Sequence, residues 1–229
     1  MPSALPSHPF CCNRSRRLGQ TSRHLRLNSS LCAIASDCGF QVISEPSYTA
    51  PGGDSSLDAL RPDAVFSGRG ISKMIDVSVV CSCAPSYRAI CQAKPAAAIA
   101  RRCQVKRTHY RRLVLEQRCS FSPVVFDALG VPSRQAVDLV TFLASSAVSS
   151  GIVPPSSQSS FIKIILTKLV FAVFDGNLDM CVDCWGHSAA QDTAPSPPPD
   201  RRSLPDSSPS PVSPAVDAID TAVLPRVFV

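Results

Sequence analysis

Several catalytic signatures are missing from this sequence of 229 residues. It contains no Asp-Asp pair, the acidic turn that a reverse-transcriptase palm requires, and this absence excludes polymerase activity. It also lacks a P-loop, a G-x-S-x-G nucleophile elbow and an H-E-x-x-H zinc motif. The chain must therefore be interpreted from other residues.

Long apolar runs are also missing. The most apolar stretch, residues 161–174, is too short to cross a bilayer and contains Lys163 and Lys168. The beginning of the sequence lacks a basic region followed by a sustained apolar one, so we expect neither a secretory signal nor a membrane partner. The eleven cysteines have no regular spacing, which favours a reducing compartment. We expect a nuclear or cytoplasmic protein, with RSRR at 14–17 as a weak import signal.

Charged residues make up only 17% of the chain and hydrophobic residues 45%, so part of it should fold around a core. The 21 prolines, against 10 glycines, indicate that other parts do not. We predict an irregular segment over residues 1–21, one domain over 22–180 and a disordered Pro/Ser-rich tail over 188–229.

Hydrophobic periodicity predicts an α/β domain with a small mixed sheet flanked by helices. Helices are expected at 22–37, 96–117, 133–148 and 161–174, and strands within 40–48, 63–66, 73–80 and 121–126. Residues 50–56 are expected to form a turn, and residues 81–94 a cysteine-bearing loop followed by a helix start at Pro95. The SGRG segment predicts a hairpin between the second and third strands, and Ser133 is expected to cap its helix.

Two aspartates lie on that hairpin. Asp63 follows Pro62, and after twelve intervening residues Asp76 lies in mid-strand, where carboxylates are uncommon. Alternation places Asp76 on one strand face with Met74, Ser78 and Val80, opposite Ile75, Val77 and Val79. Carboxylates on neighbouring strands could hold one or two Mg²⁺ ions, which would lower the pKa of an attacking water. The spacing alone also arises by chance.

Six short matches, in order, go further. They are SRHLRLN (22–28), GFQVISEPSY (39–48), LRPDAVF with IDVSVV (60–66 and 75–80), KRTHYRRL (106–113), FSPVVFDALGVPSRQA (121–136) and FDGNLDM (174–180). Together they resemble the restriction-enzyme-like endonuclease domain of non-LTR retrotransposon reverse transcriptase proteins, in the PD-(D/E)-x-K nuclease superfamily. The resemblance covers most of residues 22–180 and implies a restriction-endonuclease-like core.

The resemblance also implies a site. Glu45, Asp63 and Asp76 would be the metal ligands for Mg²⁺ or Mn²⁺. In the superfamily's simplest pattern a lysine lies two residues beyond the second acid, but here that residue is Ser78. Retroelement members are similar in supplying the lysine from the following helix, which implies Lys106 as the catalytic cation that orients water or neutralises phosphate charge. A solvated helix lysine is the alternative for Lys106.

The helix around Lys106 is strongly basic. Its arginines, which are candidate nucleic-acid contacts, are Arg101, Arg102, Arg107, Arg111 and Arg112. Mere solubility is the alternative explanation of this charge. Helical spacing puts His109 on the Lys106 side, where it either assists proton transfer or packs. DNA is the expected partner, with RNA a second one through the parent element.

A C-x-x-C pair at Cys181 and Cys184 invites a zinc interpretation. Only Asp183 and His187 lie close by as further ligands, and no second closely spaced pair follows. We therefore expect incidental cysteines and no zinc.

The leading hypothesis is a retroelement-derived, metal-dependent DNA endonuclease-like domain, which in an intact element nicks DNA for target-primed reverse transcription. One alternative is a non-catalytic nucleic-acid-binding remnant. Another is the product of a decayed element without selected activity, or an interaction protein that works through the Pro/Ser tail.

Overall fold

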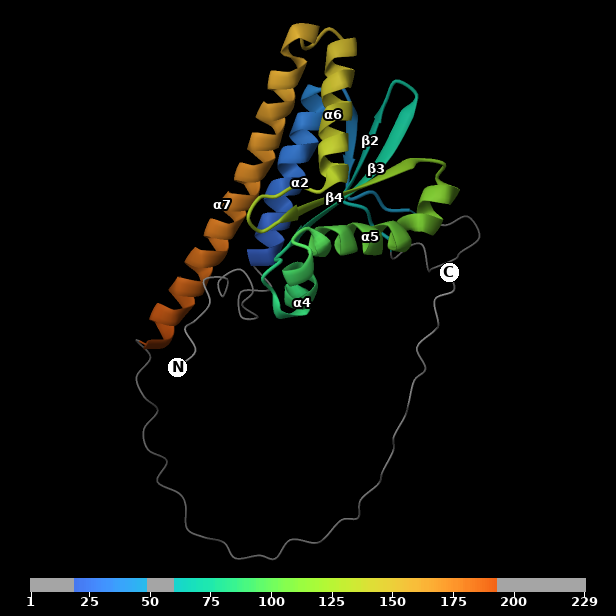
Figure 1. The fold of residues 1–229 in the computed structure, drawn as a ribbon. Coiled ribbons are helices and arrows are strands. Elements are labelled where there is room, and N and C mark those ends of the chain that lie inside the picture. Colours follow the sequence, from blue (N-terminus) through green and yellow to red (C-terminus); the bar gives the residue numbers. More distant parts are fainter. Residues whose placement is uncertain (1–18, 49–59, 193–229) are drawn as a thin grey trace, which may run out of the picture. The chain divides into compact units, whose positions relative to one another are not determined.

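A computed structural model describes residues 19–48 and 60–192, with side chains described for 22–48 and 60–182 (Figure 1). The predicted turn at 50–56, almost all of the predicted irregular segment 1–21, and the tail from 193 onward lie outside the described residues. Within the described part, every helix is too short or too polar to span a bilayer.

The predicted small mixed sheet is confirmed. Its four strands are β1 (Gln41–Ser44), β2 (Ala64–Gly68), β3 (Ile71–Val80) and β4 (Ser120–Asp127), in the spatial order β1-β2-β3-β4. The first three are antiparallel neighbours, whereas β4 runs parallel to β3. A parallel neighbour requires a crossover, and helices supply it.

The predicted hairpin closes in a two-residue turn. Gly68 pairs with Ile71, and the intervening Arg69 and Gly70 both have positive φ, +53° and +74°. Two positive φ values are the signature of a type I′ turn, whose twist matches that of the strands. The turn fixes the register of β2 against β3 and thereby the position of Asp63 relative to Asp76.

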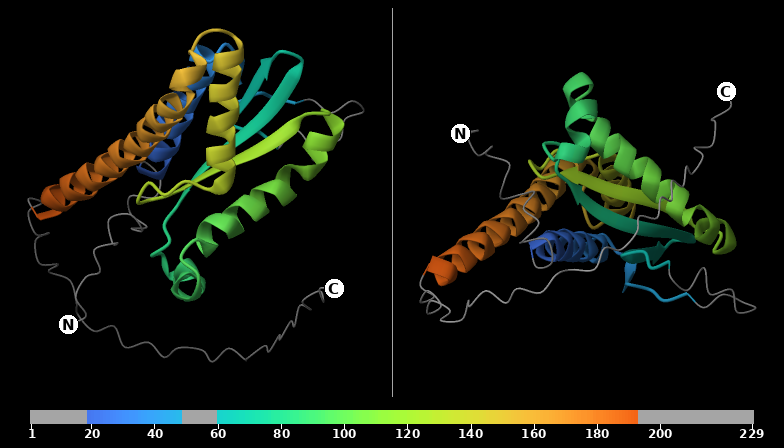
Figure 2. Two further views of the ribbon diagram at one scale, coloured as in Figure 1. Left: turned by 45° about the horizontal axis from the view of Figure 1, so that its top comes forward. Right: turned by 90° about the horizontal axis from the view of Figure 1, so that it is seen from below.

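Helices cover both faces of the sheet (Figure 2). The crossover from β3 to β4 consists of α4 (Pro85–Ala93) and α5 (Ala97–Glu116), and α5 packs on one face. On the other face lie α2 (Gly19–Asp37), α6 (Arg134–Ser149) and α7 (Gln158–Asp192), and a short 3₁₀ turn, η1 (Pro155–Ser157), precedes α7. The expected order of helix, three strands, helix, strand and two helices is observed except between β3 and β4, where two helices stand in place of one.

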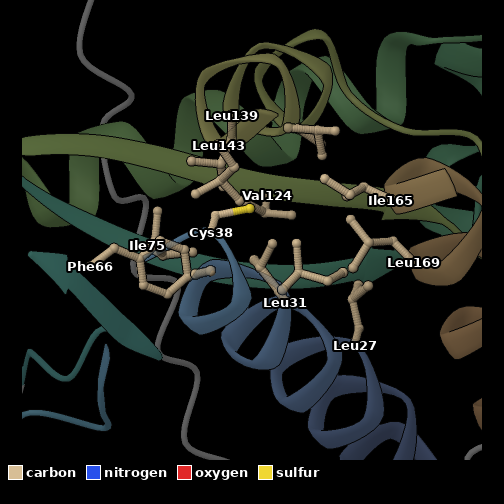
Figure 3. Close-up of a cluster of buried hydrophobic side chains, with 14 of the residues drawn as sticks. Leu27, Leu31, Cys38, Phe66, Ile75, Val124, Leu139, Leu143, Ile165 and Leu169 are labelled. Atoms are coloured by element: carbon tan, nitrogen blue, oxygen red, sulfur yellow. The ribbon is translucent and has the colours of Figure 1, made fainter. Parts of the chain in front are cut away.

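The larger core lies between the sheet and the layer of α2, α6 and α7 (Figure 3). Leu27 and Leu31 of α2, Ile75 of β3 and Leu169 of α7 are fully or almost fully buried there. The predicted alternation of β3 is confirmed, because Ile75 and Val77 enter this core while Met74 and Val80 join the two smaller clusters on the α5 side.

The expected loop at residues 81–94 was wrong, because it contains α4. Pro85 occupies the first turn after an extended Ala84, a position where proline's fixed φ suits a helix start. None of the residues of α4 is buried. Tyr87 and Cys91, one turn apart, are half-buried and pack α4 against the core on the α5 side. The helix has only nine residues, too few for periodicity alone to distinguish it from a loop.

The last helix was predicted too short, since α7 extends from Gln158 to Asp192 instead of ending at residue 174. It therefore includes Cys181 and Cys184 and overlaps the predicted start of the tail at 188. Contacts with α2 stabilise the part of the extension up to Asp179, which accepts hydrogen bonds from Ser22 (2.6 Å) and Arg26 (2.6 and 3.2 Å). These partners lie more than 150 residues away in the chain.

Candidate active site

The sheet register aligns the three predicted acids. Ser44 pairs with Ala64, and Ala64 pairs with Ile75, so Glu45, Asp63 and Asp76 are opposite one another when both ladders continue by one residue. The backbone N–H of Glu45 donates to the Asp63 carbonyl at 2.9 Å, which supports that continuation. Glu45 thus follows the end of β1, Asp63 precedes the start of β2, and both backbone positions are level with Asp76 of β3.

Asp76 and Lys106 form an ion pair beneath α5. The Lys106 Nζ atom is 2.8 Å from Oδ1 and 2.7 Å from Oδ2 of Asp76, and it donates an aligned hydrogen bond to Oδ1. The side chains are only 17% and 3% exposed, respectively. Burial raises the pKa of the Asp76 carboxyl, although the positive charge and hydrogen bond of Lys106 oppose the shift. The predicted convergence of Asp76 and Lys106 is therefore present.

Asp63 holds the other half of the site together. Its Oδ1 atom is 3.0 Å from Nε2 of His24 on α2, and its Oδ2 atom accepts the backbone N–H of Val77 on β3. The hydrogen bond to Asp63 raises the pKa of His24, while partial burial opposes the shift and the charge of Asp76 adds to it. His24, Asp63, Asp76 and Lys106 are thus electrostatically coupled, and we call them the site quartet.

His24 was not assigned a role from the sequence. It was present in the Arg-His pair of the segment 22–28, which was the only available signal. Helical spacing cannot show that His24 faces Asp63, because the contact joins residues from different elements. The neighbouring Arg23 instead points into the interface with α7, where its guanidinium donates to Asn177 at 3.2 Å.

Tyr110 is buried next to Lys106. Its hydroxyl donates to the Arg61 carbonyl at 2.8 Å, and its ring centroid lies 5.9 Å from the Lys106 ammonium. Burial, followed by the charge of Asp76, raises the pKa of Tyr110. The hydroxyl therefore stays protonated, and Tyr110 serves to position the strand end and the lysine.

The basic residues of α5 divide into two groups. Arg102 is half-buried and donates from Nε to the Ser78 hydroxyl at 3.3 Å, so a cation does approach the position where the simplest superfamily pattern has lysine. The remaining arginines, which are exposed, are Arg101, Arg107, Arg111 and Arg112. His109 is exposed as well, and its ring contacts the Tyr110 ring in a T-shaped arrangement with the centroids 4.9 Å apart.

Glu45 does not complete a metal site in this conformation. Its side chain is exposed, and its φ of +46° turns the chain out of β1. Among the described residues, no three His, Cys, Asp or Glu side chains are grouped so that they could hold an ion. Asp63 and Asp76 are therefore the acids that the structure brings together, and a ligand role for Glu45 stays a prediction.

The C-x-x-C pair lies within α7. Cys181 is half-buried, whereas the side chains of Cys184, Asp183 and His187 lie outside the described set. The contacts of the site quartet do not involve Cys181.

The sequence matches no family model and no curated protein, so the function has to be argued from the site quartet and its surroundings.

Proposed function

We propose that the chain is a retroelement-derived endonuclease-like domain that hydrolyses DNA phosphodiester bonds with Mg²⁺ or Mn²⁺. The observation that carries the proposal is the site quartet, which joins the start of β2 to the middle of β3. Asp63 immediately precedes β2, Asp76 lies on the neighbouring β3, and Lys106 approaches from the helix that the resemblance indicates. The small mixed sheet flanked by helices also supports the proposal.

The donor chemistry fits a hard divalent cation. Asp63 and Asp76 would hold it, because carboxylate oxygens are the ligands Mg²⁺ prefers and Mg²⁺ in phosphate chemistry often uses only one or two of them. Such an ion would polarise the scissile phosphate and lower the pKa of the attacking water. The buried Asp76 carboxylate, already paired with one cation, is a group that needs positive charge nearby.

The chain's own residues supply positioning and charge. Lys106, released from Asp76, would neutralise the phosphate oxygen on which negative charge develops. His24 and the Val77 N–H hold the Asp63 carboxylate in one orientation. Arg102, behind Ser78, provides a further cation on the same face of α5. Tyr110 limits how far the lysine can retreat.

A non-catalytic nucleic-acid-binding remnant is the second candidate. The observation that favours it is that both carboxylates already have protein partners: Asp76 pairs with Lys106, and Asp63 contacts His24 and the Val77 N–H. Such a site is electrostatically complete without an added ion. Among the described residues, however, no aligned hydrogen bond reaches the buried Oδ2 atom of Asp76. Under this alternative the fold and the exposed arginines of α5 retain DNA binding, while the hydrolysis is lost.

A nicking assay separates the two functions. Supercoiled plasmid is incubated with the full chain and Mg²⁺ or Mn²⁺, and we expect Asp76→Asn to abolish conversion to open circles. Asp138→Asn is the matched control, because Asp138 is an exposed aspartate paired with Arg134 on α6. Equal background cleavage by the wild type, Asp76→Asn and Asp138→Asn would defeat the endonuclease proposal.

A decayed product without selected activity predicts a different outcome. Circular dichroism and limited proteolysis of the full chain test it, because a folded domain should yield a protected fragment that contains residues 22–180. Absence of any protected fragment would support the decayed product over both nucleic-acid functions.

A further inference from the structure

Helix α7 carries an apolar row on the side that faces away from the core. Its members, with their exposed fractions, are Ile164 (52%), Phe171 (60%), Phe174 (43%), Leu178 (61%) and Val182 (57%). Ile164, Phe171 and Leu178 recur every seven residues, and at 100° per residue all five fall on one side of the helix. The core side of α7 is separate, since Ile165, Leu169 and Val173 are buried there.

The row lies at the edge of the helical layer. In Figures 1 and 2, α2 and α6 flank α7 on one side and leave its other side uncovered by the described elements. The loop after β4 widens the apolar surface, because Gly130 packs against Val170 and Phe174 and its neighbours Leu129 and Val131 are 63% and 53% exposed. An apolar surface of this extent on a protein usually marks an interface.

Two charges beside the row indicate its partner. Lys168 and Asp175 are exposed, lie seven residues apart and flank the same side of the row. In a parallel pair of α7 helices the two-fold axis would run along the helices and place the Lys168 and Asp175 of the two copies on opposite sides of the interface, so these charges would not meet. In an antiparallel pair with Phe171 opposite the partner's Phe174, Lys168 is offset from Asp175 of the partner by two residues, roughly 3 Å along the axis, on the same side of the interface. Two-fold symmetry produces this ion pair twice.

We propose that this face of α7 binds a second copy of the chain as an antiparallel helix pair. The row from Ile164 to Val182 is about 27 Å long, enough for several layers of interhelical packing. Phe171 and Phe174 lie at the two-fold axis, and Leu178 packs against Thr167 of the partner subunit. The interface is isologous, so the self-complementary charges are sufficient and no other macromolecule is needed.

The test is sedimentation velocity on the full chain over roughly 1–100 µM, a range suited to dissociation constants of a modest interface. The wild type should reach twice the 24.4 kDa monomer mass. Lys168→Asp and Asp175→Lys should each raise the dissociation constant at least about tenfold, because both ion pairs become repulsive. The double variant Lys168→Asp/Asp175→Lys should restore dimerisation.

The controls separate pairing from folding. Arg111→Glu, an equally large charge reversal on the exposed side of α5, should leave the dissociation constant unchanged. Asp175 also interacts electrostatically with Arg26 of α2, so its replacement could alter the fold, and Lys168→Asp is the cleaner single variant. The unfolding midpoint of each variant is measured alongside. A wild type of 24.4 kDa at every concentration overturns the proposal, as does a double variant that is no more dimeric than the single ones.

Discussion

Lys106 and Asp76 are opposite charges that are largely removed from water, and each offsets the free-energy cost of burying the other. Because the Asp76 side chain is 3% exposed, removing Lys106 leaves a buried carboxylate whose charge is uncompensated. We expect Lys106→Met to lower the free energy of unfolding at neutral pH by about 3–5 kcal/mol. Urea unfolding measures this, with Arg107→Met as the control because Arg107 is exposed on the same helix.

The pH dependence of that loss has a definite sign. The pKa of Asp76 in the folded wild type is already raised by burial, and removal of Lys106 raises it further. The deficit of Lys106→Met should be smallest below the carboxyl pKa of the unfolded chain, about 3.9, where Asp76 is protonated in both states. It should grow as pH rises through the raised folded value. A deficit independent of pH would show that lost packing, not charge, is responsible.

His24 contributes to stability when it is protonated and positively charged. Its folded pKa is raised by Asp63, so the stability it contributes is full below the unfolded value of about 6.5 and is lost as pH rises through the folded value. A histidine NMR titration should place His24 above 6.5 in the wild type and lower in Asp63→Asn. His24→Gln should remove this part of the pH dependence of unfolding, whereas His109→Gln should not. A His24 midpoint that Asp63→Asn leaves unchanged contradicts the contact.

At the scale of elements, α2 and α7 approach unusually closely at Gly176. A Cβ atom built there would lie 2.5 Å from Cα and 2.6 Å from Cγ of Arg23. We expect Gly176→Ala to destabilise the fold by about 1–3 kcal/mol, although alanine favours helices by about 1 kcal/mol over glycine. Thermal and urea unfolding measure the change. Gln104→Ala, at an exposed position of α5, should remain within about 0.5 kcal/mol of the wild type.

The elements that the sequence predicted are those with local signals. The strand alternation around Asp76, the Ser133 cap and the SGRG turn depend on neighbouring residues, and the Ser133 hydroxyl does accept the Ala136 N–H at 3.1 Å. The position of α7 depends instead on α2, and the nine-residue α4 is held by tertiary packing of its half-buried Tyr87 and Cys91. The same division applies to the site: the hairpin spacing predicted Asp63 beside Asp76, whereas the His24 contact and the outward turn at Glu45 arise from tertiary structure.

At the scale of the whole molecule, charge is distributed unevenly. The chain has a net charge of +6, and the outer side of α5 presents Arg101, Arg107 and Arg111 to solvent. If this surface binds DNA, changing all three to glutamine should weaken binding and reduce the slope of log affinity against log salt by up to about 0.9 per lost phosphate contact. Fluorescence anisotropy at several NaCl concentrations measures the slope. The triple variant Arg134→Gln/Lys163→Gln/Arg69→Gln, with cations on other elements, controls for net charge, and equal slopes in the two triple variants would contradict a DNA surface on α5.

Asn177 connects three distant parts of the chain. It accepts from Arg23 near the beginning of α2 and donates to the Ala128 carbonyl after β4 at 2.7 Å. During translation α2 leaves the ribosome about 150 residues before Asn177 does. The apolar side of α2 that packs against α7 therefore stays exposed until α7 has been synthesised. A nascent chain that stalls before α7 is complete should therefore be a substrate for chaperones, and the domain should acquire protease resistance late, in a single step.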